Sequence, residues 1–363
     1  MKDKRTLIYF LMLSTFFFSM MALLATADTS GSSSARSSTL YNPDTRTFIY
    51  KNNADIKLPM ASTTKIMTAL IAIEELDLSE TISVPTEAVG VEGSSVYLKD
   101  GDMLTAKDLI YSVLLQSAND AAAALAIHIS GNIPAFAEKM TNRARDIGLT
   151  DTSFMNPHGL DADNHYTTAH DLALLAAEAL KNDTFKQISG TYKYTFKLGD
   201  TTRTVVNHNK LLKSYDGCIG VKTGYTKKSG RCLVSAAEKD GITLVAVTLD
   251  DPNDWADHKN MLDRGFQSLE RINLEEAIPL PESITTISAD GAEVPIGLST
   301  DSLIKYTDEN VDYYISLPSY ITGDVRQGDK IGEVTVTVGS REETIHIIAL
   351  RDVKIKKTTR RFL

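Results

Sequence analysis

Helical and strand-like hydrophobic patterns occupy separate blocks of this chain, and the order of the blocks constrains its fold more than any other feature. Residues 39–55 alternate as a hairpin around an Asn-Pro-Asp turn, and apolar residues then recur at helical spacing as far as Leu180. From Tyr192 the pattern is that of strands, followed by one more helix from Trp255 to Glu270. Helices inserted between strands that pair antiparallel predict an α+β domain over residues 39–271.

The sequence beyond Ile272 has a different texture, with short alternating runs separated by turns. The segment PLPES (279–283) marks the boundary, and residues 332–350 alternate as a β-hairpin. We therefore expect a small all-β domain over residues 272–363, which carries no motif for chemistry of its own.

The first 27 residues have the pattern of a signal peptide. A positively charged head precedes an apolar run from Leu7 to Leu24, which ends in a small-residue Ala-Thr-Ala site. Export would place the rest of the chain outside the cytoplasm, in a secreted or membrane-peripheral form. An uncleaved N-terminal anchor is the alternative, because the run is close to membrane-spanning length. The polar, small-residue segment 28–38 is interpreted as a linker.

The net charge limits the classes of binding partner that we expect, and the cysteine content limits the possible disulfides. The net charge of −9 makes nucleic acid an unexpected partner. Basic residues gather only in the C-terminal tail RDVKIKKTTRRFL, which predicts either a solvated terminus or a weak contact with anionic lipid or wall polymer. Cys218 and Cys232 lie in apolar, strand-like runs, so buried free thiols are expected, with a disulfide as the alternative in an exported chain.

Ser62 and Lys65 begin an apolar helix in the segment PMASTTKIMTAL. Side chains at positions i and i+3 of a helix share a face, and a desolvated lysine has a depressed pKa, so Lys65 can take the hydroxyl proton of Ser62. The alternative is a serine cap followed by a solvated lysine. A second S-x-x-K copy, Ser302 to Lys305, lies in a strand-like run, where the two side chains point to opposite faces.

Two further polar motifs follow along the chain. Ser117 and Asn119 lie at a break between two apolar helices, where they would project into a cleft or simply cap the helices. Lys222 and Thr223 lie on a strand and can hold a carboxylate, while Gly224 lets another chain approach the backbone. For this second motif the alternative is an exposed edge strand guarded by its lysine.

Together, S-x-x-K, S-x-N and K-T-G in this order form the set found in penicillin-recognising serine enzymes. The chain resembles the low-molecular-mass penicillin-binding proteins, the serine-type D-alanyl-D-alanine carboxypeptidases of peptidase family S11. The resemblance runs from about residue 39 to about residue 270, through PMASTTKIMTAL, LLQSANDAA, NPHGLDADNHYTTAHDLA and GVKTGYTKKSGRCLVSA. It implies a penicillin-binding/β-lactamase-like domain, with helices on both faces of an antiparallel sheet, followed by a small all-β domain.

The resemblance also implies a role for each matching residue. Ser62 would be the acylated nucleophile, Lys65 its base, and Ser117 the group that helps a proton reach the leaving D-alanine. The substrate would be a peptidoglycan stem peptide, with β-lactams as covalent inhibitors and no cofactor or metal. The substrate-binding set would be Asn119, Lys222, Thr223, Gly224 and Tyr225, with the backbone N–H groups of Ser62 and Tyr225 as the oxyanion hole.

Two departures from the family pattern stand out. Some relatives carry an arginine just before K-T-G that assists carboxylate binding, whereas this chain has Asn207-His208-Asn209 there. The arginine's role in carboxylate binding is therefore either absent from this chain or carried out by His208. Many relatives also end in an amphipathic membrane helix, and no such pattern is visible here.

A class A β-lactamase shares S-x-x-K and K-T-G, but needs a glutamate in an E-x-x-L-N loop to activate water. Residues 178–182, EALKN, match only the ends of that pattern and close a helix. A non-catalytic wall-binding protein of the same fold is a further alternative, which the three intact motifs oppose.

A metallopeptidase is an alternative because acidic and imidazole side chains cluster after Asn156. Their spacing, H-x2-D-x3-H-x4-H, matches no zinc pattern that mechanism supports. Structural roles are therefore expected for His158, Asp161, His165 and His170.

Overall fold

The computed structural model describes residues 33–287 and 291–354 of this 363-residue chain. The predicted signal peptide and the end of the basic tail lie outside the described residues, so both stay predictions. Within the described part, no helix has both the length and the apolar character needed to cross a membrane.

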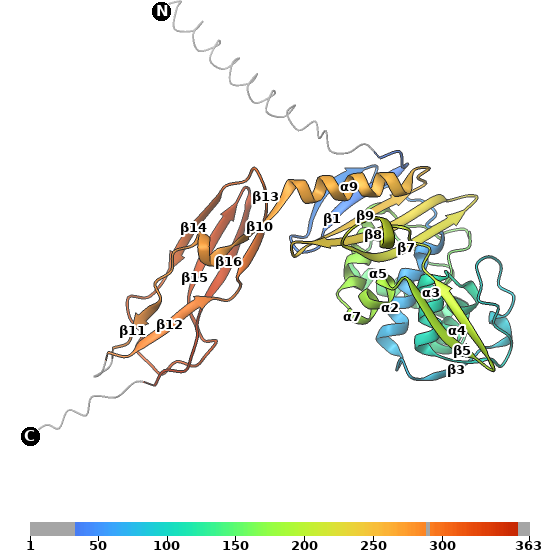
Figure 1. The fold of residues 1–363 in the computed structure, drawn as a ribbon, viewed down its shortest axis with the longest axis horizontal. Coiled ribbons are helices and arrows are strands. Elements are labelled where there is room, and N and C mark those ends of the chain that lie inside the picture. The colour runs from blue at the N-terminus through green and yellow to red at the C-terminus, as the bar shows by residue number, and fades with distance from the viewer. Residues whose placement is uncertain (1–32, 288–290, 355–363) are drawn as a thin grey trace, which may run out of the picture.

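A five-stranded antiparallel sheet forms the centre of the larger region (Figure 1). The hairpin predicted near the N-terminus is confirmed, and its first strand pairs with a strand formed some two hundred residues later. The strand that carries K-T-G lies at one edge of the sheet, open on one side. In spatial order the strands are β2 (Thr47–Asn52), β1 (Ser37–Asn42), β9 (Ile242–Leu249), β8 (Gly230–Lys239) and β7 (Cys218–Thr226).

Helices cover both faces of this sheet, as the resemblance implies. Alternate residues of β9 separate the two cores: Val245 and Val247 pack among the helices of one face, and Leu244 packs with Leu262 of α9 (Asp254–Ser268) on the other. Figure 1 shows α9 alone above the sheet and the remaining helices below it. These are α2 (Lys65–Glu75), α3 (Ala106–Leu115), α4 (Asn119–Ser130), α5 (Ile133–Ile147), α6 (Ala169–Leu180) and α7 (Asp183–Gly190).

The predicted break between two apolar helices is confirmed. The first of them, α3, ends at Leu115 and α4 begins at Asn119, and the left-handed Gly131 caps the end of α4. Short elements connect the larger ones: two hairpins, two 3₁₀ turns and a one-turn helix. They are η1 (Ala61–Thr64), β3 (Thr81–Ser83), η2 (Thr86–Ala88), β4 (Met103–Thr105), β5 (Lys193–Leu198), β6 (Thr201–Val206) and α8 (Leu211–Ser214).

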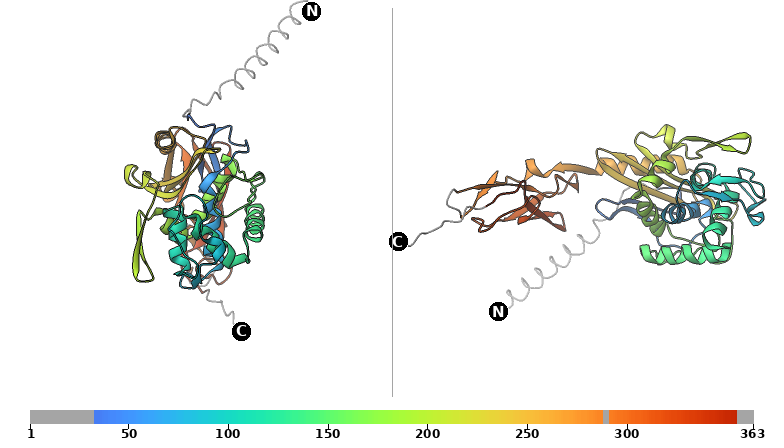
Figure 2. Two further views of the ribbon diagram at one scale, coloured as in Figure 1. Left: turned by 90° about the vertical axis from the view of Figure 1, so that its right-hand side faces the viewer. Right: turned by 90° about the horizontal axis from the view of Figure 1, so that it is seen from below.

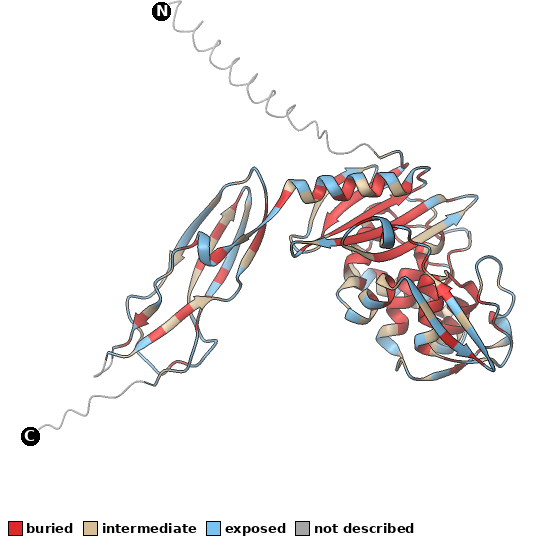
Figure 3. Ribbon diagram, viewed as in Figure 1, coloured by how far each residue is buried: buried red, intermediate tan, exposed pale blue. Residues whose placement is uncertain are grey.

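The C-terminal region is a second sheet with its own core. Figures 1 and 2 show it at one end of the long axis, joined to the first region through β10. Figure 3 shows a separate set of buried positions inside it, which includes Val334, Val336 and Ile347. The boundary at residue 272 stays a prediction. The elements are β10 (Leu269–Asn273), α10 (Leu274–Ala277), β11 (Ser283–Thr285), β12 (Glu293–Leu298), β13 (Ser302–Tyr306), β14 (Val311–Ser316), β15 (Lys330–Val338) and β16 (Arg341–Ala349).

The linker predicted over residues 28–38 is wrong for its described part, residues 33–38. Ser37 and Ser38 are fully buried in β1, and the Ser34 hydroxyl donates hydrogen bonds to Asp251 at 2.9 Å and Asp257 at 2.8 Å. Small polar residues suggest flexibility in a sequence, but here their size lets the chain lie close beside β9 and their hydroxyls find acceptors there.

The two cysteines are free thiols, as expected. Cys232 is buried, and burial raises the pKa of its thiol to about 12. Cys218 is only half-buried, because it opens the edge strand β7 instead of lying within the sheet.

Candidate active site

Ser62 lies in the 3₁₀ turn η1 that leads directly into α2, and Lys65 is the first residue of α2. The prediction that the two side chains meet on one face is confirmed, because Lys65 Nζ lies 3.0 Å from Ser62 Oγ. Lys65 is fully buried. The difference from the prediction is local: the serine precedes the α-helix on a tighter turn instead of lying within its first turn.

Lys65 Nζ has three oxygen neighbours. Besides Ser62 Oγ, they are Asn119 Oδ1 at 2.6 Å and the His158 carbonyl oxygen at 2.5 Å. Burial, and next the nearby Lys222, lower the pKa of Lys65 well below its ordinary value. A neutral amine has two N–H donors and one lone pair. In the neutral form of Lys65, the amide and carbonyl oxygens, which only accept, can take both N–H donors and leave the lone pair for the Ser62 hydroxyl.

Asn119 and Ser117 lie at the break between α3 and α4, as predicted. The Asn119 side chain accepts from Lys65 and donates to the Glu92 carbonyl oxygen at 2.5 Å, so both ends of its amide have partners within the chain. Ser117 has a left-handed backbone with φ of 61° and lines the same cleft as Ser62. The break therefore turns Ser117 into the cleft, while Asn119 contacts Lys65.

The K-T-G motif lies on the edge strand β7, beside the turn that carries Ser62. Lys222 is buried, which lowers its pKa to about 7, and its Nζ donates to the Thr223 carbonyl oxygen at 2.9 Å. Thr223 and Tyr225 line the cleft. A Cβ on Gly224 would lie 3.0 Å from the Ser62 backbone nitrogen. Gly224 is thus needed for close approach, as predicted, but the backbone that approaches it belongs to the turn of this chain.

A loop between α5 and α6 holds the Ser62 turn from the opposite side. A Cβ on Gly159 would lie 1.9 Å from the Ala61 carbonyl oxygen, and Gly159 has a φ of +90°. His165 Nδ1 accepts from the Met155 N–H at 3.0 Å, and its Nε2 lies 2.8 Å from Thr64 Oγ1. Since burial lowers the pKa of His165 to about 4, the ring is neutral and its proton is on Nε2. Thr64 then donates onward to the Ala61 carbonyl oxygen at 2.8 Å.

The residues behind the metallopeptidase alternative have separate partners. His170 pairs with Asp55 at 2.7 Å, Asp161 accepts from Thr226, and His165 binds Thr64. In residues 33–287 and 291–354, no three His, Cys, Asp or Glu side chains gather where a metal ion could bind.

Glu178, the end residue of the β-lactamase-like loop pattern, lies on α6 and pairs with Arg143 and Lys181. It is not part of the cleft lining. The second S-x-x-K copy lies on β13, as its sequence context predicts, where Lys305 pairs with Glu270.

Part of the predicted set lines one cleft of about 520 Å³, whereas Lys65, Asn119 and Lys222 are buried and do not line it. Ser62, Ser117, Thr223, Gly224 and Tyr225 all line it. A slightly larger cavity of about 570 Å³ lies beside β10 and holds none of the predicted site residues. We therefore take the smaller cleft as the candidate active site, because Ser62 and four other predicted site residues line it.

His208 also lines the cleft, but partial burial and the charge of Lys222 lower its pKa. A neutral imidazole brings no positive charge to a carboxylate, so of the two alternatives the lowered pKa favours the absence of the arginine's role over its transfer to His208. Sequence reasoning missed Lys210, Arg231, Asp254 and Trp255, which line the same cleft. No sequence spacing signals them, because they lie in a loop, a strand and a helix that meet only in the folded chain.

Comparisons with known proteins agree with this geometry. The family model described as D-alanyl-D-alanine carboxypeptidase, Peptidase S11, matches residues 24–253. The carboxypeptidase DacF of Bacillus subtilis is 38% identical over 219 residues, which is 59% of this chain and 56% of that protein's length. DacC of Escherichia coli is 28% identical over 330 residues, covering 84% of this chain and 80% of DacC.

Two solved structures resemble the whole fold or its larger region. Penicillin-binding protein 5 from Haemophilus influenzae has a TM-score of 0.68 at 25% identity, covering 90% of this chain and 99% of that one. The Streptomyces K15 DD-transpeptidase has a TM-score of 0.62 at 32% identity, covering 66% of this chain and 99% of that one. The chain belongs to the D-alanyl-D-alanine carboxypeptidase family S11, the serine-type, penicillin-binding hydrolases that act on the cell wall outside the cytoplasm.

Proposed function

We propose that this chain removes the terminal D-alanine from peptidoglycan stem peptides through an ester intermediate on Ser62. One observation carries the proposal: the buried Lys65 amine lies 3.0 Å from the Ser62 hydroxyl, and its other two neighbours are pure acceptors. That arrangement fits a lysine acting as a base towards a serine nucleophile.

In the first step, Ser62 Oγ attacks the carbonyl carbon of the penultimate D-alanine while its proton moves to Lys65 Nζ. Negative charge develops on the carbonyl oxygen and is stabilised by the backbone N–H groups of Ser62 and Tyr225. The close approach of β7 to the Ser62 turn at Gly224 supports this pairing of donors.

In the second step, the bond between the carbonyl carbon and the leaving nitrogen breaks. The proton held by Lys65 reaches that nitrogen with the Ser117 hydroxyl as the relay, so D-alanine leaves as a neutral amine. Its carboxylate is bound by Lys222 and Thr223 until then. Support for these roles comes from the position of Ser117 and Thr223 in the lining of one cleft with Ser62.

Hydrolysis of the ester completes the cycle: Lys65 takes a proton from water as the water oxygen attacks the ester carbonyl, and that proton passes to Ser62 Oγ as the acyl–oxygen bond breaks. A β-lactam acylates the same serine, but its leaving nitrogen stays tethered to the acyl group. Glu178 is paired outside the cleft, so it does not correspond to the glutamate that activates water in a class A β-lactamase.

Cellular placement is part of the proposal. Cleavage after residue 27 would release an enzyme that is secreted or peripheral at the outer face of the cytoplasmic membrane. The basic tail would supply at most a weak contact with anionic surfaces, and a nucleic-acid partner is not proposed because the net charge is −9.

Labelling by a fluorescent penicillin tests the proposal, followed by an assay for D-alanine released from a pentapeptide. We expect wild type to label and release D-alanine, and Ser62→Ala to do neither. Failure of wild type to label would support the non-catalytic alternative. Rapid turnover of the penicillin without release of D-alanine would support the β-lactamase.

A further inference from the structure

We propose that Arg231, fixed in place by Asp254, binds the C-terminal carboxylate of the substrate at the far end of the cleft. The inference rests on the proposed function and adds a residue that neither the motifs nor the family resemblance assigns. It also gives a reason for the two polar side chains and the tryptophan that sequence reasoning missed.

Strand pairing brings Arg231 to the cleft. Arg231 of β8 is directly opposite Tyr225 of β7, so the two side chains share a face of the sheet, and Thr223 lies on that face two residues earlier. All three residues line the cleft that contains Ser62. A peptide lying along the open edge of β7 would therefore carry its end group past Thr223 and Arg231.

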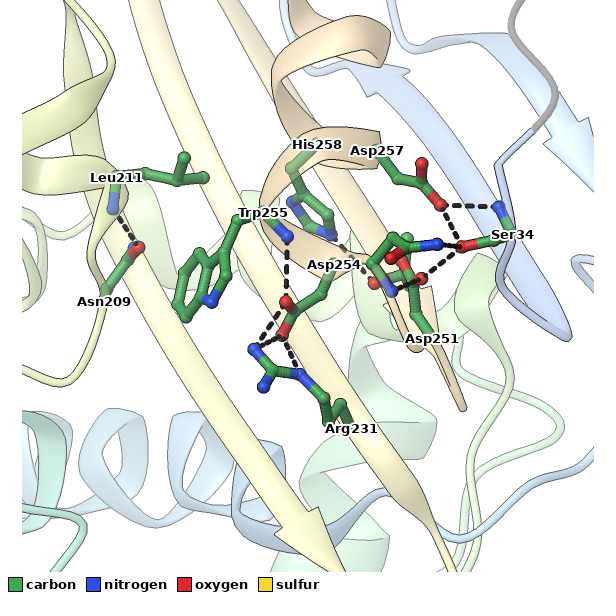
Figure 4. A network of polar contacts seen from close by, with 11 residues as sticks. Ser34, Asn209, Leu211, Arg231, Asp251, Asp254, Trp255, Asp257 and His258 are labelled. Carbon is green, nitrogen blue, oxygen red and sulfur yellow. Dashed lines mark hydrogen bonds and ion pairs between the residues drawn. The ribbon is translucent and has the colours of Figure 1, made fainter.

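Asp254 holds the guanidinium in a fixed direction (Figure 4). Arg231 Nη2 donates to both carboxylate oxygens of Asp254 at 2.6 and 2.8 Å, and Nε donates at 3.0 Å. The Trp255 ring lies 5.8 Å from the guanidinium carbon. The Asp254 side chain is only 5% exposed, whereas that of Arg231 is 44% exposed. Asp254 engages Nε and Nη2, so the donors of Nη1 are left for a ligand, and Arg231 is the more exposed partner of the pair.

The other basic groups near Ser62 supply charge less dependably. Lys65 has a strongly lowered pKa, and that of Lys222 is lowered to about 7, so half of the Lys222 side chains are neutral near neutral pH. The pKa of His208 is lowered as well. A guanidinium stays protonated throughout this range, and its Nη1 donors can form charge-assisted hydrogen bonds with a carboxylate.

The segment before K-T-G offers no substitute. Asn209 donates to the Gly220 carbonyl oxygen at 2.8 Å, and Asn207 donates to the Ser189 carbonyl oxygen at 2.9 Å. These two side chains hold the backbone around β7 and are not free to bind substrate. Lys210 remains as a competitor because it lines the cleft and is exposed, with its Nζ 5.9 Å from the Trp255 ring.

The test compares two ligands that differ only in the carboxylate: a fluorescent penicillin and its methyl ester. The rate constant of acylation is measured for wild type, Arg231→Ala, Arg231→Lys, Asp254→Asn and Lys210→Ala. Arg271→Ala is the matched control, since Arg271 is 43% exposed and faces Asp301 outside the cleft. Thermal unfolding by circular dichroism checks that each variant folds.

We expect wild type to prefer the acid, and Arg231→Ala to lose on the order of 10- to 100-fold with the acid but less than about threefold with the ester. Arg231→Lys should recover part of the preference, and Asp254→Asn should lose part of it. Lys210→Ala and Arg271→Ala should keep it.

An equal loss for both ligands in Arg231→Ala would reduce Arg231 to a structural residue and overturn the inference. An unchanged preference in Arg231→Ala, with a lost preference in Lys210→Ala, would overturn it in favour of Lys210. Both outcomes are compatible with acylation of Ser62 in the wild type. A wild type that no penicillin labels would instead refute the proposed function itself.

Discussion

At the scale of single residues, burial decides what the basic side chains of the cleft can do. Lys65 is desolvated and has no carboxylate hydrogen-bonded to its amine, so its neutral form is favoured. Lys222 is equally buried but keeps a pKa of about 7, so it still carries charge over part of the physiological range. In the proposed mechanism, Lys65 transfers the proton and Lys222 supplies charge.

The pKa of Lys222 predicts how carboxylate recognition depends on pH. Lys222 is mostly protonated below about pH 7 and mostly neutral above it, so carboxylate binding should weaken as pH rises through this value. The ratio of acylation rates for a penicillin and its methyl ester should therefore fall between about pH 6 and about pH 8. It should level off above 1, because Arg231 keeps its charge. A ratio that stays constant over this range would show that Lys222 does not titrate there.

His165 should act on Ser62 through Thr64 and Ala61. His165→Ala removes a relay that fixes the Ser62 turn, so we expect acylation to slow on the order of tenfold, with about 1–3 kcal/mol lost in stability. Thr64→Val should slow acylation by a similar factor. The double variant should be little slower than either single variant, because both changes break the same chain of hydrogen bonds. His170→Ala, whose ring pairs with Asp55 elsewhere, is the control and should acylate normally. Fully additive effects on the acylation rate would show that His165 and Thr64 act independently of each other.

At the scale of elements, the Ser62 turn is held between the loop before α6 and the edge strand β7. Gly159 and Gly224 mark the two contacts, where backbone approaches too closely for a side chain. The helix patterns, the break before α4 and the strand context of the second S-x-x-K copy could all be predicted, because each depends on local periodicity. Arg231 and Asp254 could not, because their contact depends on how α9 crosses β8. The buried Ser37 shows the same limit. The small polar residues around it resemble a linker in sequence, and the long-range pairing of Ser37 with β9 orders this segment.

A comparison of two glycines distinguishes the cost of backbone strain from the cost of a steric clash. Gly159 and Gly148 have nearly the same φ, +90° and +91°, but only Gly159 has a neighbour within 4 Å of the Cβ position. Gly148→Ala should therefore cost about 1 kcal/mol and leave acylation unchanged. Gly159→Ala should cost about 1–3 kcal/mol more and slow acylation, because the Ala61 carbonyl must move. Chemical denaturation and penicillin labelling measure both. Equal stability losses would show that the Gly159 contact adjusts easily.

At the scale of the whole molecule, the residues that line the candidate cleft lie between Ser62 and Trp255, while the C-terminal sheet packs around a core of its own. The two regions are joined through β10, which pairs with β13. The sequence predicted the change of texture near residue 272, because alternation with short turns is a local signal.

A core substitution in the second region tests this division. Ile347 is fully buried there, so Ile347→Ala should cost about 2–5 kcal/mol of local stability. Penicillin acylation should stay within about twofold of wild type, since contacts beyond 10 Å usually act independently. Unfolding followed by two probes should show the C-terminal sheet melting first. A parallel loss of acylation would show that the regions are coupled.

The most direct measurement of the central claim is the mass of the protein after exposure to benzylpenicillin, with peptide mapping of the adduct. Wild type should gain one penicilloyl group on Ser62, and Ser62→Ala should gain none. Lys65→Ala should fold but acylate on the order of 10²- to 10⁴-fold more slowly, because it lacks the base. Acylation of Lys65→Ala at a near-normal rate at neutral pH, or an adduct on a residue other than Ser62, would contradict the account.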